Sequence, residues 1–256
     1  MRYVRFWKDK IQWGIINEGL VKVLDGDFLQ GGQATGEELA LEDLKLLAPV
    51  QPGKIVCVGL NYIDHATEMN LAVPEEPILF LKPPSAILQH NGTIEYPSIS
   101  SRVDFEAELA IVIGKQARLI SEDQAAEYIF GYTCANDVTA RDLQQRDGQW
   151  SRAKSFDTFL PLGPWIETAV NPGGLEVELR LNGEIKQKSN TRNFIFPVNY
   201  MVSFISQVMT LEPGDVIITG TPPGVGAMEQ GDEVVIWIQG IGELKNFVGK
   251  GSFNGK

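Results

Sequence analysis

The chain has 256 residues, which is enough for one large domain, or for a large domain with a small appendage. Apolar residues make up 43% and charged residues 21%, a globular balance that argues against a disordered chain or a coiled coil. With 22 basic against 33 acidic side chains, the formal net charge is −11. A surface of that sign repels nucleic acid, although a local cluster of cations or a metal ion can still bind a small anionic substrate.

Cysteine and histidine are scarce. Cys57 and Cys134 lie far apart in apolar stretches, which is typical of reduced, buried thiols and not of a disulfide framework. With only His65 and His90 present, a metal site built from three histidines is excluded. The N-terminus lacks the apolar core of a signal peptide, and no apolar run approaches the ~20 residues of a membrane span. We therefore expect a soluble, cytoplasmic protein with neither a membrane nor a nucleic acid as partner.

Residues 1–50 are predicted to form a small N-terminal β domain, and residues 51–256 a larger second domain. The chain begins with a strand-like alternation, continues with a hairpin pattern over 11–24, and then enters a short helix or extended segment over 36–50. Two prolines and a glycine at 48–53 mark the boundary between the two domains.

The larger domain is predicted to consist mostly of strands. Helical patterns are fewer, since only 121–129, with Ser121 as N-cap, and 197–211 have helical features. The balance predicts a β-rich α+β fold with a mixed or barrel-like sheet. The predicted strands cover residues 54–61, 77–88, 104–114, 128–139, 175–183, 215–221 and 232–244.

Two glutamates in the stretch DFEAELAIVIG are the strongest candidates for chemistry. On a strand, Glu106 and Glu108 project from the same face, and apolar residues follow them directly. Carboxylates that converge near a core repel each other unless a cation joins them. Asp137 follows another apolar strand, and three oxygen ligands suit Mg²⁺ or Mn²⁺. The alternative is a half-buried strand whose solvent face is simply acidic.

Basic side chains gather just after Asp137, in an otherwise acidic protein. The segment 139–165 contains Arg141, Gln144, Arg146, Arg152 and Lys154. Arginine binds carboxylates with a fork of donors and lysine supplies a point charge, so this group beside a divalent ion would hold a small anionic substrate. The same residues would also fit a solvated loop with balanced charges.

Two further motifs carry weaker signals. His65 and Glu68 are three residues apart, so on a helical turn the carboxylate can orient the imidazole to activate water, although such pairs are often incidental surface contacts. The Gly-rich segment 220–228 lacks the lysine of a phosphate-binding loop. It brings Thr221 and backbone N–H groups toward a ligand, or it is only a tight turn between strands.

The motifs, taken in chain order, resemble the fumarylacetoacetate hydrolase family. They are IVCVGLNYIDHATEM, PILFLKP, DFEAELAIVIGK, GYTCANDVTARDLQ, WSRAKSFDTFLPLGPW and LEPGDVIITGTPPGVG. The similarity covers residues 54–248 and includes the bacterial branch labelled 2-hydroxyhepta-2,4-diene-1,7-dioate isomerase, as well as the acylpyruvase and oxaloacetate decarboxylase branch. The first fifty residues resemble the small N-terminal domain of many bacterial members.

The resemblance implies a catalytic domain with a mixed β-sandwich or rolled sheet, usually in a homodimer. It implies that Glu106, Glu108 and Asp137 bind Mg²⁺ or Mn²⁺. Lys154 would lie beside the metal and substrate, and His65 and Glu68 would form a catalytic dyad on a mobile lid. The positions that match substrate-contacting residues of the family are Lys82, Arg141, Gln144 and Thr221.

One site of this kind serves three reactions of 2-oxo and 2,4-dioxo acids through a metal-bound enolate. Water activated by His65 would hydrolyse acylpyruvates such as fumarylacetoacetate-like compounds, and loss of CO₂ would decarboxylate oxaloacetate. Proton transfer alone would isomerise a hydroxy-diene dioate of the 5-carboxymethyl-2-hydroxymuconate type. Hydrolysis or decarboxylation is the leading hypothesis and isomerisation the alternative. A non-catalytic protein that binds metal and oxalate-like anions is the alternative from another class, but it would need neither the dyad nor Lys154.

Overall fold

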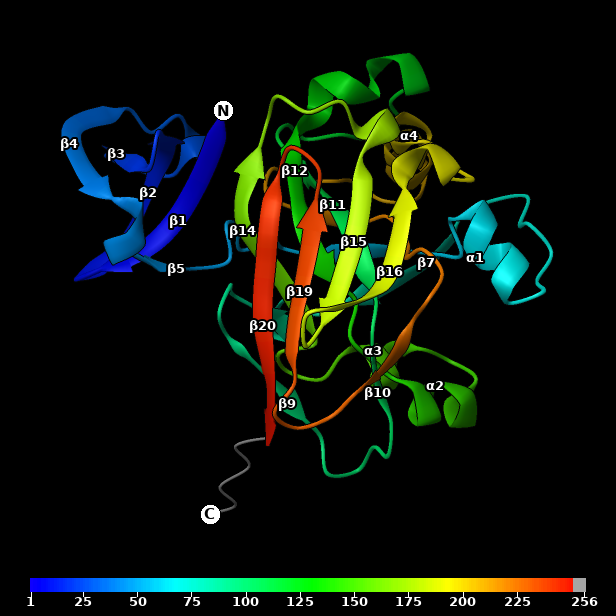
Figure 1. Cartoon of the computed structure of the whole chain (residues 1–256). Coiled ribbons are helices and arrows are strands. Elements are labelled where there is room, and N and C mark those ends of the chain that lie inside the picture. The colour runs from blue at the N-terminus through cyan, green and yellow to red at the C-terminus, as the bar shows by residue number, and fades with distance from the viewer. Residues whose placement is uncertain (251–256) are drawn as a thin grey trace.

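A computed structural model describes residues 1–250 of the chain. Within this range the strands form three sheets of twelve, five and three strands. Figure 1 shows the N-terminal strands on one side of the molecule and the α1 segment on the opposite side. No helix in the described range is long and apolar enough to cross a membrane.

The twelve-stranded sheet has the main order β4-β3-β2-β1-β14-β12-β11-β17-β6-β7, with β5 paired to β1 and β8 paired to β14. Most neighbours are antiparallel, but β17 and β6 are parallel. Its strands are β1 (Arg2–Lys8), β2 (Lys10–Asn17), β3 (Leu20–Leu24), β4 (Ala34–Ala40), β5 (Lys45–Leu46), β6 (Ile55–Gly59), β7 (Ile78–Lys82), β8 (Ile87–Leu88), β11 (Ala107–Ile113), β12 (Ile129–Asn136), β14 (Leu160–Glu167) and β17 (Val216–Ile218).

The two smaller sheets lie against this one. The five-stranded sheet has the order β16-β15-β19-β20-β9, and the three-stranded sheet the order β13-β10-β18. Their strands are β9 (Thr93–Tyr96), β10 (Val103–Phe105), β13 (Thr139–Ala140), β15 (Glu176–Leu181), β16 (Glu184–Asn190), β18 (Gly226–Met228), β19 (Glu233–Ile238) and β20 (Gly242–Lys250).

Helices are short and lie around the sheets. The α-helices are α1 (Ile63–Glu68), α2 (Arg141–Asp147), α3 (Ser151–Lys154) and α4 (Val198–Val208), and the 3₁₀ helices are η1 (Phe28–Gln30), η2 (Leu41–Asp43), η3 (Pro84–Ala86), η4 (Glu122–Tyr128), η5 (Pro172–Gly174) and η6 (Thr191–Asn193). The β-rich α+β fold with rolled and stacked sheets, predicted from the sequence, is confirmed.

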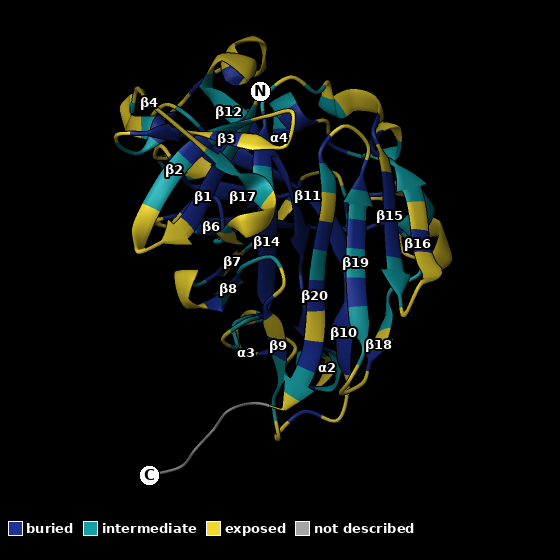
Figure 2. Ribbon diagram, turned by 60° about the vertical axis from the view of Figure 1, so that its left-hand side comes forward, coloured by how far each residue is buried: buried dark blue, intermediate teal, exposed yellow. Residues whose placement is uncertain are grey.

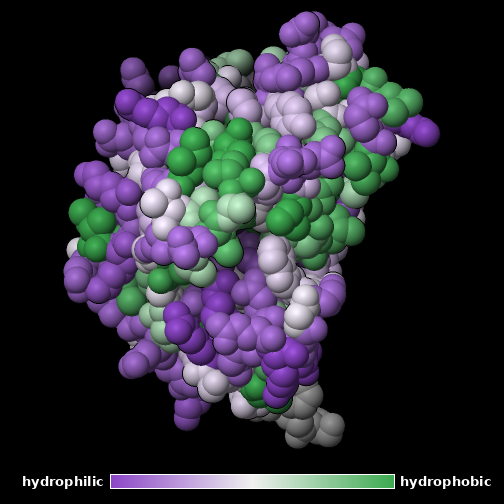
Figure 3. All heavy atoms as spheres, turned by 90° about the vertical axis from the view of Figure 1, so that its right-hand side faces the viewer, coloured by the Kyte–Doolittle hydropathy of each residue, from purple (hydrophilic) through white to green (hydrophobic). Residues whose placement is uncertain are grey.

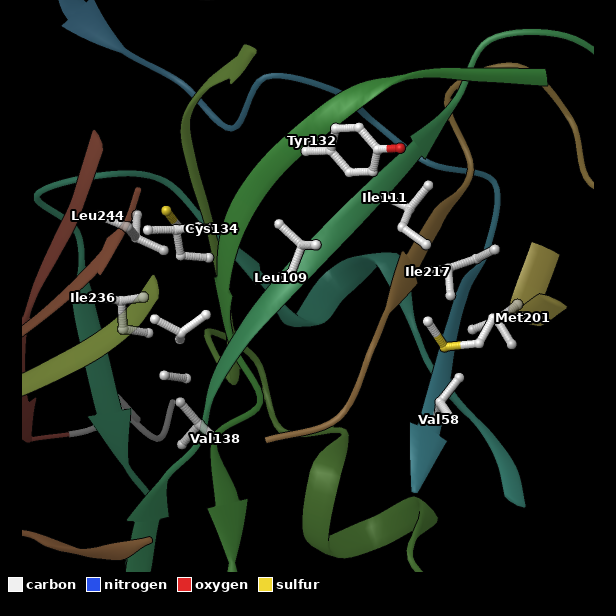
Figure 4. Close-up of a cluster of buried hydrophobic side chains, with 14 of the residues drawn as sticks. Val58, Leu109, Ile111, Tyr132, Cys134, Val138, Met201, Ile217, Ile236 and Leu244 are labelled. Atoms are coloured by element: carbon white, nitrogen blue, oxygen red, sulfur yellow. The ribbon is translucent and has the colours of Figure 1, made fainter. Parts of the chain in front are cut away.

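The main core fills the space between the twelve-stranded and five-stranded sheets. Along β11, Leu109 and Ile111 face this core, whereas Ala110 and Val112 face the opposite side, as alternation on a strand requires. Figure 4 shows Leu109 and Ile111 of β11 in one cluster with Ile236 of β19. Figure 2 shows that these central strands are buried, while exposed residues concentrate in the turns and edge strands. The central strands of the large sheet are therefore buried on both faces.

The N-terminal strands extend the large sheet at one edge. β1 pairs antiparallel with β14, where Arg2 lies opposite Glu167. The Glu167 carboxylate also accepts hydrogen bonds from the N-terminal ammonium group at 2.9 Å and from Arg2 at 3.3 Å. The predicted hairpin is present as β2 and β3. A small apolar cluster of the N-terminal strands contains Val4 and Phe6 of β1 and Val21 and Val23 of β3.

Several elements differ from the sequence-based expectation. The single strand predicted over 104–114 is two strands, because the chain passes at Glu106 from the three-stranded to the twelve-stranded sheet. The helical segment predicted over 121–129 is present as the 3₁₀ helix η4, and Ser121 and Gln124 form its capping box. The predicted helix over 197–211 is α4. The sequence patterns did not predict β14, β16, α2 or α3.

Candidate active site

Three buried carboxylates lie close together, where β10 ends, β11 begins and β12 ends. One oxygen from each of Glu106, Glu108 and Asp137 lies within 4.8 Å of the other two. The side chains are almost fully buried, with relative exposures of 6%, 2% and 1%. The predicted convergence of the three acids is therefore present in the structure. Their role as metal ligands stays a prediction.

Backbone contacts fix these acids in place. The Glu106 N–H donates to Asn136 Oδ1, and the Asp137 N–H donates to the Glu106 carbonyl oxygen, both at 2.9 Å. These two bonds join the junction between β10 and β11 to the end of β12. The Glu108 Oε2 atom accepts a hydrogen bond of 2.7 Å from the Gly220 N–H, which belongs to the Gly-rich segment. The strands that hold the three acids are therefore tied to one another and to this segment.

Cationic side chains surround the acids. The Lys154 ammonium group donates to Glu106 Oε2 at 3.0 Å and also to Asp137 Oδ2. Lys82 is fully buried and donates to Asp137 Oδ1 at 2.5 Å and to the Val138 carbonyl oxygen at 3.2 Å. Arg141 completes the group by donating to Glu106. Three carboxylates thus face three cations, and the cluster is close to neutral.

Burial and charge move the pKa values of the two glutamates in opposite directions. Burial alone would raise the pKa of Glu106, but the charges of Lys154 and Arg141 outweigh it and lower this pKa to about 2. The pKa of Glu108 is raised well above its ordinary value by burial, and then by the charges of Asp137 and Glu106. Glu106 is therefore ionised at neutral pH, whereas Glu108 holds a proton more strongly than an ordinary glutamate.

The three carboxylates fit a divalent metal ion that prefers oxygen ligands. Glu108 forms no ion pair within residues 1–250, so it is a buried carboxylate without a cation of its own. Such a group is costly unless a positive charge completes it. Oxygen-only ligands suit Mg²⁺ or Mn²⁺, and the divalent ion would give the near-neutral cluster an excess of positive charge. That excess matches a small substrate that carries one or two carboxylates.

The acids line a cavity of about 400 Å³, which we call the central cavity. Phe80 and Trp150 form an aromatic pair on its wall, with ring centroids 5.1 Å apart. Figure 3 shows the face that carries α1, where apolar and hydrophilic side chains alternate around a hollow. The charged and polar side chains that line the cavity include His65, Glu106, Glu108, Asp137, Arg141, Gln144, Gln145, Lys154 and Thr221.

The predicted dyad is present at the mouth of this cavity. The α1 helix places His65 Nδ1 at 3.0 Å from Glu68 Oε2. His65 lines the cavity itself, whereas Glu68 lies behind it and is 42% exposed. Because Nδ1 is engaged by the carboxylate, Nε2 is the ring nitrogen left for a reacting group or a water.

The four predicted substrate-binding residues occupy different places. Gln144 and Thr221 line the central cavity, and so does Arg141. The Arg141 guanidinium is already divided among three partners, since it donates to Asp104 at 2.9 Å, to Gln144 at 2.7 Å and to Glu106. Lys82 lies behind Asp137 and is not part of the lining. In this position the Lys82 ammonium group holds the Asp137 carboxylate in place, and its role in binding a substrate stays a prediction.

Two polar residues around the site escaped the sequence analysis. Gln187 is fully buried, accepts from the Ala107 N–H and donates to Thr221 Oγ1, both at 2.9 Å, so it joins the acid-bearing strand to the Gly-rich segment. Asp64 precedes His65 and accepts hydrogen bonds from Ser189 and Asn193. The sequence did contain a signal for the hairpin that carries Gln187, namely the Asn182-Gly183 pair. Both residues have positive φ and form the two-residue hairpin turn that begins β16.

Comparison with known proteins agrees with this site. The fumarylacetoacetate (FAA) hydrolase C-terminal family model matches residues 54–249, and the Rv2993c-like N-terminal family model matches residues 1–49. The chain therefore belongs to the fumarylacetoacetate hydrolase family, as its motifs predict. The family includes a tautomerase, an isomerase and a hydrolase, so the chain belongs to a family of enzymes.

Two relatives show how close the similarity is. An uncharacterized protein of Methanocaldococcus jannaschii, MJ1656, is 56% identical over 89% of this chain and 93% of its own. The mitochondrial oxaloacetate tautomerase Fahd2a of Rattus norvegicus is 45% identical over 79% of this chain and 68% of its own.

Two solved structures have the same fold. The 5-carboxymethyl-2-hydroxymuconate delta-isomerase from Mycobacterium smegmatis has a TM-score of 0.93 at 42% identity, covering 98% of this chain and 100% of that one. The fumarylpyruvate hydrolase from Pseudomonas aeruginosa, solved with Mn²⁺ and pyruvate, has a TM-score of 0.73 at 37% identity, covering 80% of this chain and 91% of that one. Isomerase, tautomerase and hydrolase thus occur among the relatives.

Proposed function

We propose that the protein is a divalent-metal-dependent enzyme that hydrolyses the C3–C4 bond of acylpyruvates. The observation that carries the proposal is the position of His65, which is paired with Glu68 and lines the same cavity as the three carboxylates. A carboxylate-oriented imidazole is the usual arrangement for removing a proton from water. The structure of a related hydrolase with Mn²⁺ and pyruvate supports both the metal and the product class.

Glu106, Glu108 and Asp137 would hold the ion, which we propose to be Mg²⁺ or Mn²⁺. When bound, the ion would supply Lewis-acid polarisation of the 2-oxo group and charge compensation for the substrate carboxylate. Lys154 holds the Glu106 and Asp137 carboxylates in position. Arg141 orients Glu106 and Gln144, and its remaining N–H groups are available to a carboxylate in the cavity.

His65 performs the proton transfer in this proposal. Its Nε2 accepts a proton from water, and the hydroxide oxygen adds to the C4 carbonyl carbon of the substrate. The C3–C4 bond then breaks, and its electron pair stays on C3 until a proton adds there. The balance is one acylpyruvate and one water in, and pyruvate and one carboxylic acid out. Glu68 keeps the imidazole in the tautomer whose Nε2 is free and stabilises its protonated form.

A second candidate function is proton transfer at C3 without water. The observation that favours it is the similarity to an oxaloacetate tautomerase at 45% identity and to a hydroxymuconate isomerase at 42% identity, both higher than the 37% shared with the hydrolase. The same carboxylates, Lys154 and cavity would serve this reaction, and His65 would then exchange the proton with substrate carbon or oxygen. Decarboxylation of oxaloacetate, the third reaction of such a site, also needs no water.

A panel of substrates tests the proposal. Acylpyruvates, oxaloacetate and a hydroxy-diene dioate would be assayed with Mg²⁺ and with Mn²⁺. We expect acylpyruvate hydrolysis as the fastest reaction, and a loss of ~10²-fold or more in His65→Gln, the lower range for a general base. His90→Gln is the matched control, because His90 accepts a hydrogen bond from the Lys245 N–H away from the central cavity. Faster tautomerisation or isomerisation would favour the second candidate, and binding without turnover would favour a non-catalytic protein.

We also propose that the protein acts as a homodimer in the cytoplasm, on a small anionic 2-oxo acid. Exposed apolar side chains near α1 and β7, including Met69, Leu71, Ile78 and Leu81, are consistent with a subunit contact on that side. Sedimentation equilibrium of the intact chain would test the oligomeric state. A species of single-chain mass at micromolar concentration would contradict the dimer.

A further inference from the structure

A second cavity, of about 490 Å³, lies apart from the acids and their cations. The beginning of α4, the η5 and η6 turns, η4 and β12 all contribute to its wall. None of the residues that line the central cavity lines this one. Its apolar wall includes Phe194, Pro197 and Val198.

The N-terminus of α4 opens into the second cavity. Pro197 is the N-cap residue and provides no side-chain cap, and the first turn contains no acidic residue. The first backbone N–H groups of an α-helix have no partner within the helix. Val198 and Asn199, which carry two of these groups, line the cavity. The helix therefore presents uncapped donors and the positive end of its dipole to whatever occupies this space.

The side chain of Tyr132 provides an independent observation. Tyr132 lines the second cavity, is only 8% exposed, and makes no hydrogen bond through its hydroxyl within the described part of the chain. Figure 4 shows its ring in the core cluster beside Ile111. Burial raises the pKa of Tyr132 to about 12, so the hydroxyl is a neutral donor at physiological pH. The hydroxyl reaches the surface of the second cavity, where a ligand can accept a hydrogen bond from it.

The charged side chains that line the second cavity indicate which class of ligand it can bind. Arg192 lines the cavity on its exposed side and forms no ion pair with any of residues 1–250. Its guanidinium matches a carboxylate, as do the helix N–H groups and the Tyr132 hydroxyl. Glu122 also lines the cavity and is exposed, and it would repel a second negative charge. We propose that the second cavity binds a small organic monocarboxylate with a short apolar body.

The segment formed by η6 and Phe194 contacts both the second cavity and the α1 helix. Asn193 follows Arg192 in η6 and donates to Asp64 of α1 at 3.0 Å. Phe194 lines the second cavity and packs edge-on against Tyr62, at the start of α1, with ring centroids 4.8 Å apart. A ligand that orders η6 and Phe194 therefore stabilises the docked position of α1 and of the dyad it carries. The second cavity is in this way an effector site for the central one.

Benzoate is a suitable probe, with neutral benzamide and dianionic phthalate as comparisons. It would be titrated calorimetrically into the Mg²⁺-loaded protein and into Arg192→Gln, Tyr132→Phe and Arg118→Gln. Arg118 is an exposed arginine outside both cavities and serves as the matched control. We expect saturable binding that weakens by about tenfold or more in Arg192→Gln and by about fivefold in Tyr132→Phe, as expected for a charged and a neutral hydrogen bond. Benzamide and phthalate should each bind at least about tenfold more weakly than benzoate.

Arg141→Gln distinguishes the two cavities. Loss of benzoate binding in Arg141→Gln but not in Arg192→Gln would place the anion in the central cavity and overturn the proposal, as would equal affinity in the wild type and Arg192→Gln. The effector role has its own readout in hydrogen exchange of residues 63–68. Benzoate should slow exchange there in the wild type and not in Arg192→Gln, whereas unchanged exchange in the wild type at saturation would contradict the coupling. Neither readout depends on which reaction the central cavity catalyses.

Discussion

The Glu68 carboxylate, which binds His65 Nδ1, also accepts a hydrogen bond of 3.0 Å from the Gly224 N–H on the Gly-rich segment. The dyad is therefore connected to the segment whose Gly220 and Thr221 line the central cavity, and not only to its own helix. Gly224 has a φ of +91°, and a Cβ atom there would lie 2.2 Å from the Lys186 carbonyl oxygen, so only glycine fits at this position. The connection fixes where α1 docks.

Substitutions at Glu68 should separate its two roles. Glu68→Gln keeps an oxygen that can accept from the Gly224 N–H but loses the charge that stabilises protonated His65, whereas Glu68→Ala loses both. We expect acylpyruvate kcat to fall by roughly tenfold in Glu68→Gln, which loses a charge-assisted hydrogen bond, and by about fivefold more in Glu68→Ala, which also loses a neutral one. Steady-state kinetics at saturating metal measures both. Equal losses would show that the Gly224 contact has no part in catalysis.

Asp64 is predicted to hold α1 over the cavity from its other end. Its Oδ2 atom accepts from the Ser189 hydroxyl at 2.5 Å and from Asn193 at 3.0 Å. Asp64→Ala should leave metal affinity unchanged, raise KM about tenfold, and speed hydrogen exchange across α1, because the helix is released from β16 and η6. Asp43→Ala, at an exposed aspartate of η2 with no role at the site, is the control. An Asp64→Ala enzyme with wild-type KM would rule out the anchoring role.

Lys82 offers a test of electrostatic balance in the site. Lys82→Met removes a buried ammonium group and leaves the Asp137 carboxylate with Lys154 as its cationic partner. Breaking a buried pair costs about 3–5 kcal/mol, so the metal-free variant should be less stable by a figure in that range. A more negative site should bind Mg²⁺ or Mn²⁺ more tightly, so the metal should restore more stability in the variant than in the wild type. Urea unfolding with and without metal measures both quantities. Smaller metal stabilisation in Lys82→Met would contradict this account of the cluster.

Metal binding should release a proton from Glu108. Its raised pKa means that the metal-free protein retains this proton to a higher pH than an ordinary glutamate would. Because the ion needs the carboxylate form, metal affinity should rise with pH until the raised pKa is passed, and then level off. Calorimetry in buffers of different ionisation enthalpy counts the protons released. Glu108→Gln should abolish the release, and proton uptake on metal binding by the wild type would refute the assignment.

Only part of the acid cluster could be predicted from the residue pattern. The spacing places Glu106 and Glu108 on one face of a strand, but it left open whether they form a site with Asp137, which only the family resemblance implied. Asp137 is brought close by the pairing of β11 with β12, in which Ala107 lies opposite Asn136. The strand break at Glu106 was not predictable, because it depends on a second sheet that captures residues 103–105 through pairing with β13 and β18.

Residues that act through distant partners were harder to find. Gln187 lies on the polar strand β16, where no apolar alternation marks burial, and its partners Ala107 and Thr221 are remote in sequence. Lys82 matches a substrate-contacting position of the family, and that role stays a prediction; the contact of its ammonium group with Asp137 was not predicted from the sequence. Packing between sheets decides such placements, and a single sequence contains little information about it.

Exchange of the pyruvate C3 hydrogens with D₂O tests the central claim most directly, because it reports proton handling at the site without the water-addition step. NMR would follow the exchange with Mg²⁺ or Mn²⁺ in the wild type, Asp137→Asn and His65→Ala. We predict metal-dependent exchange in the wild type, loss of that exchange in Asp137→Asn, and a much smaller decrease in His65→Ala than the ~10²-fold loss of acylpyruvate hydrolysis. No exchange in the wild type would contradict a 2-oxo acid site at these carboxylates. Equal loss of exchange and hydrolysis in His65→Ala would mean that His65 transfers the substrate proton itself, and the isomerase or tautomerase function would then replace hydrolysis.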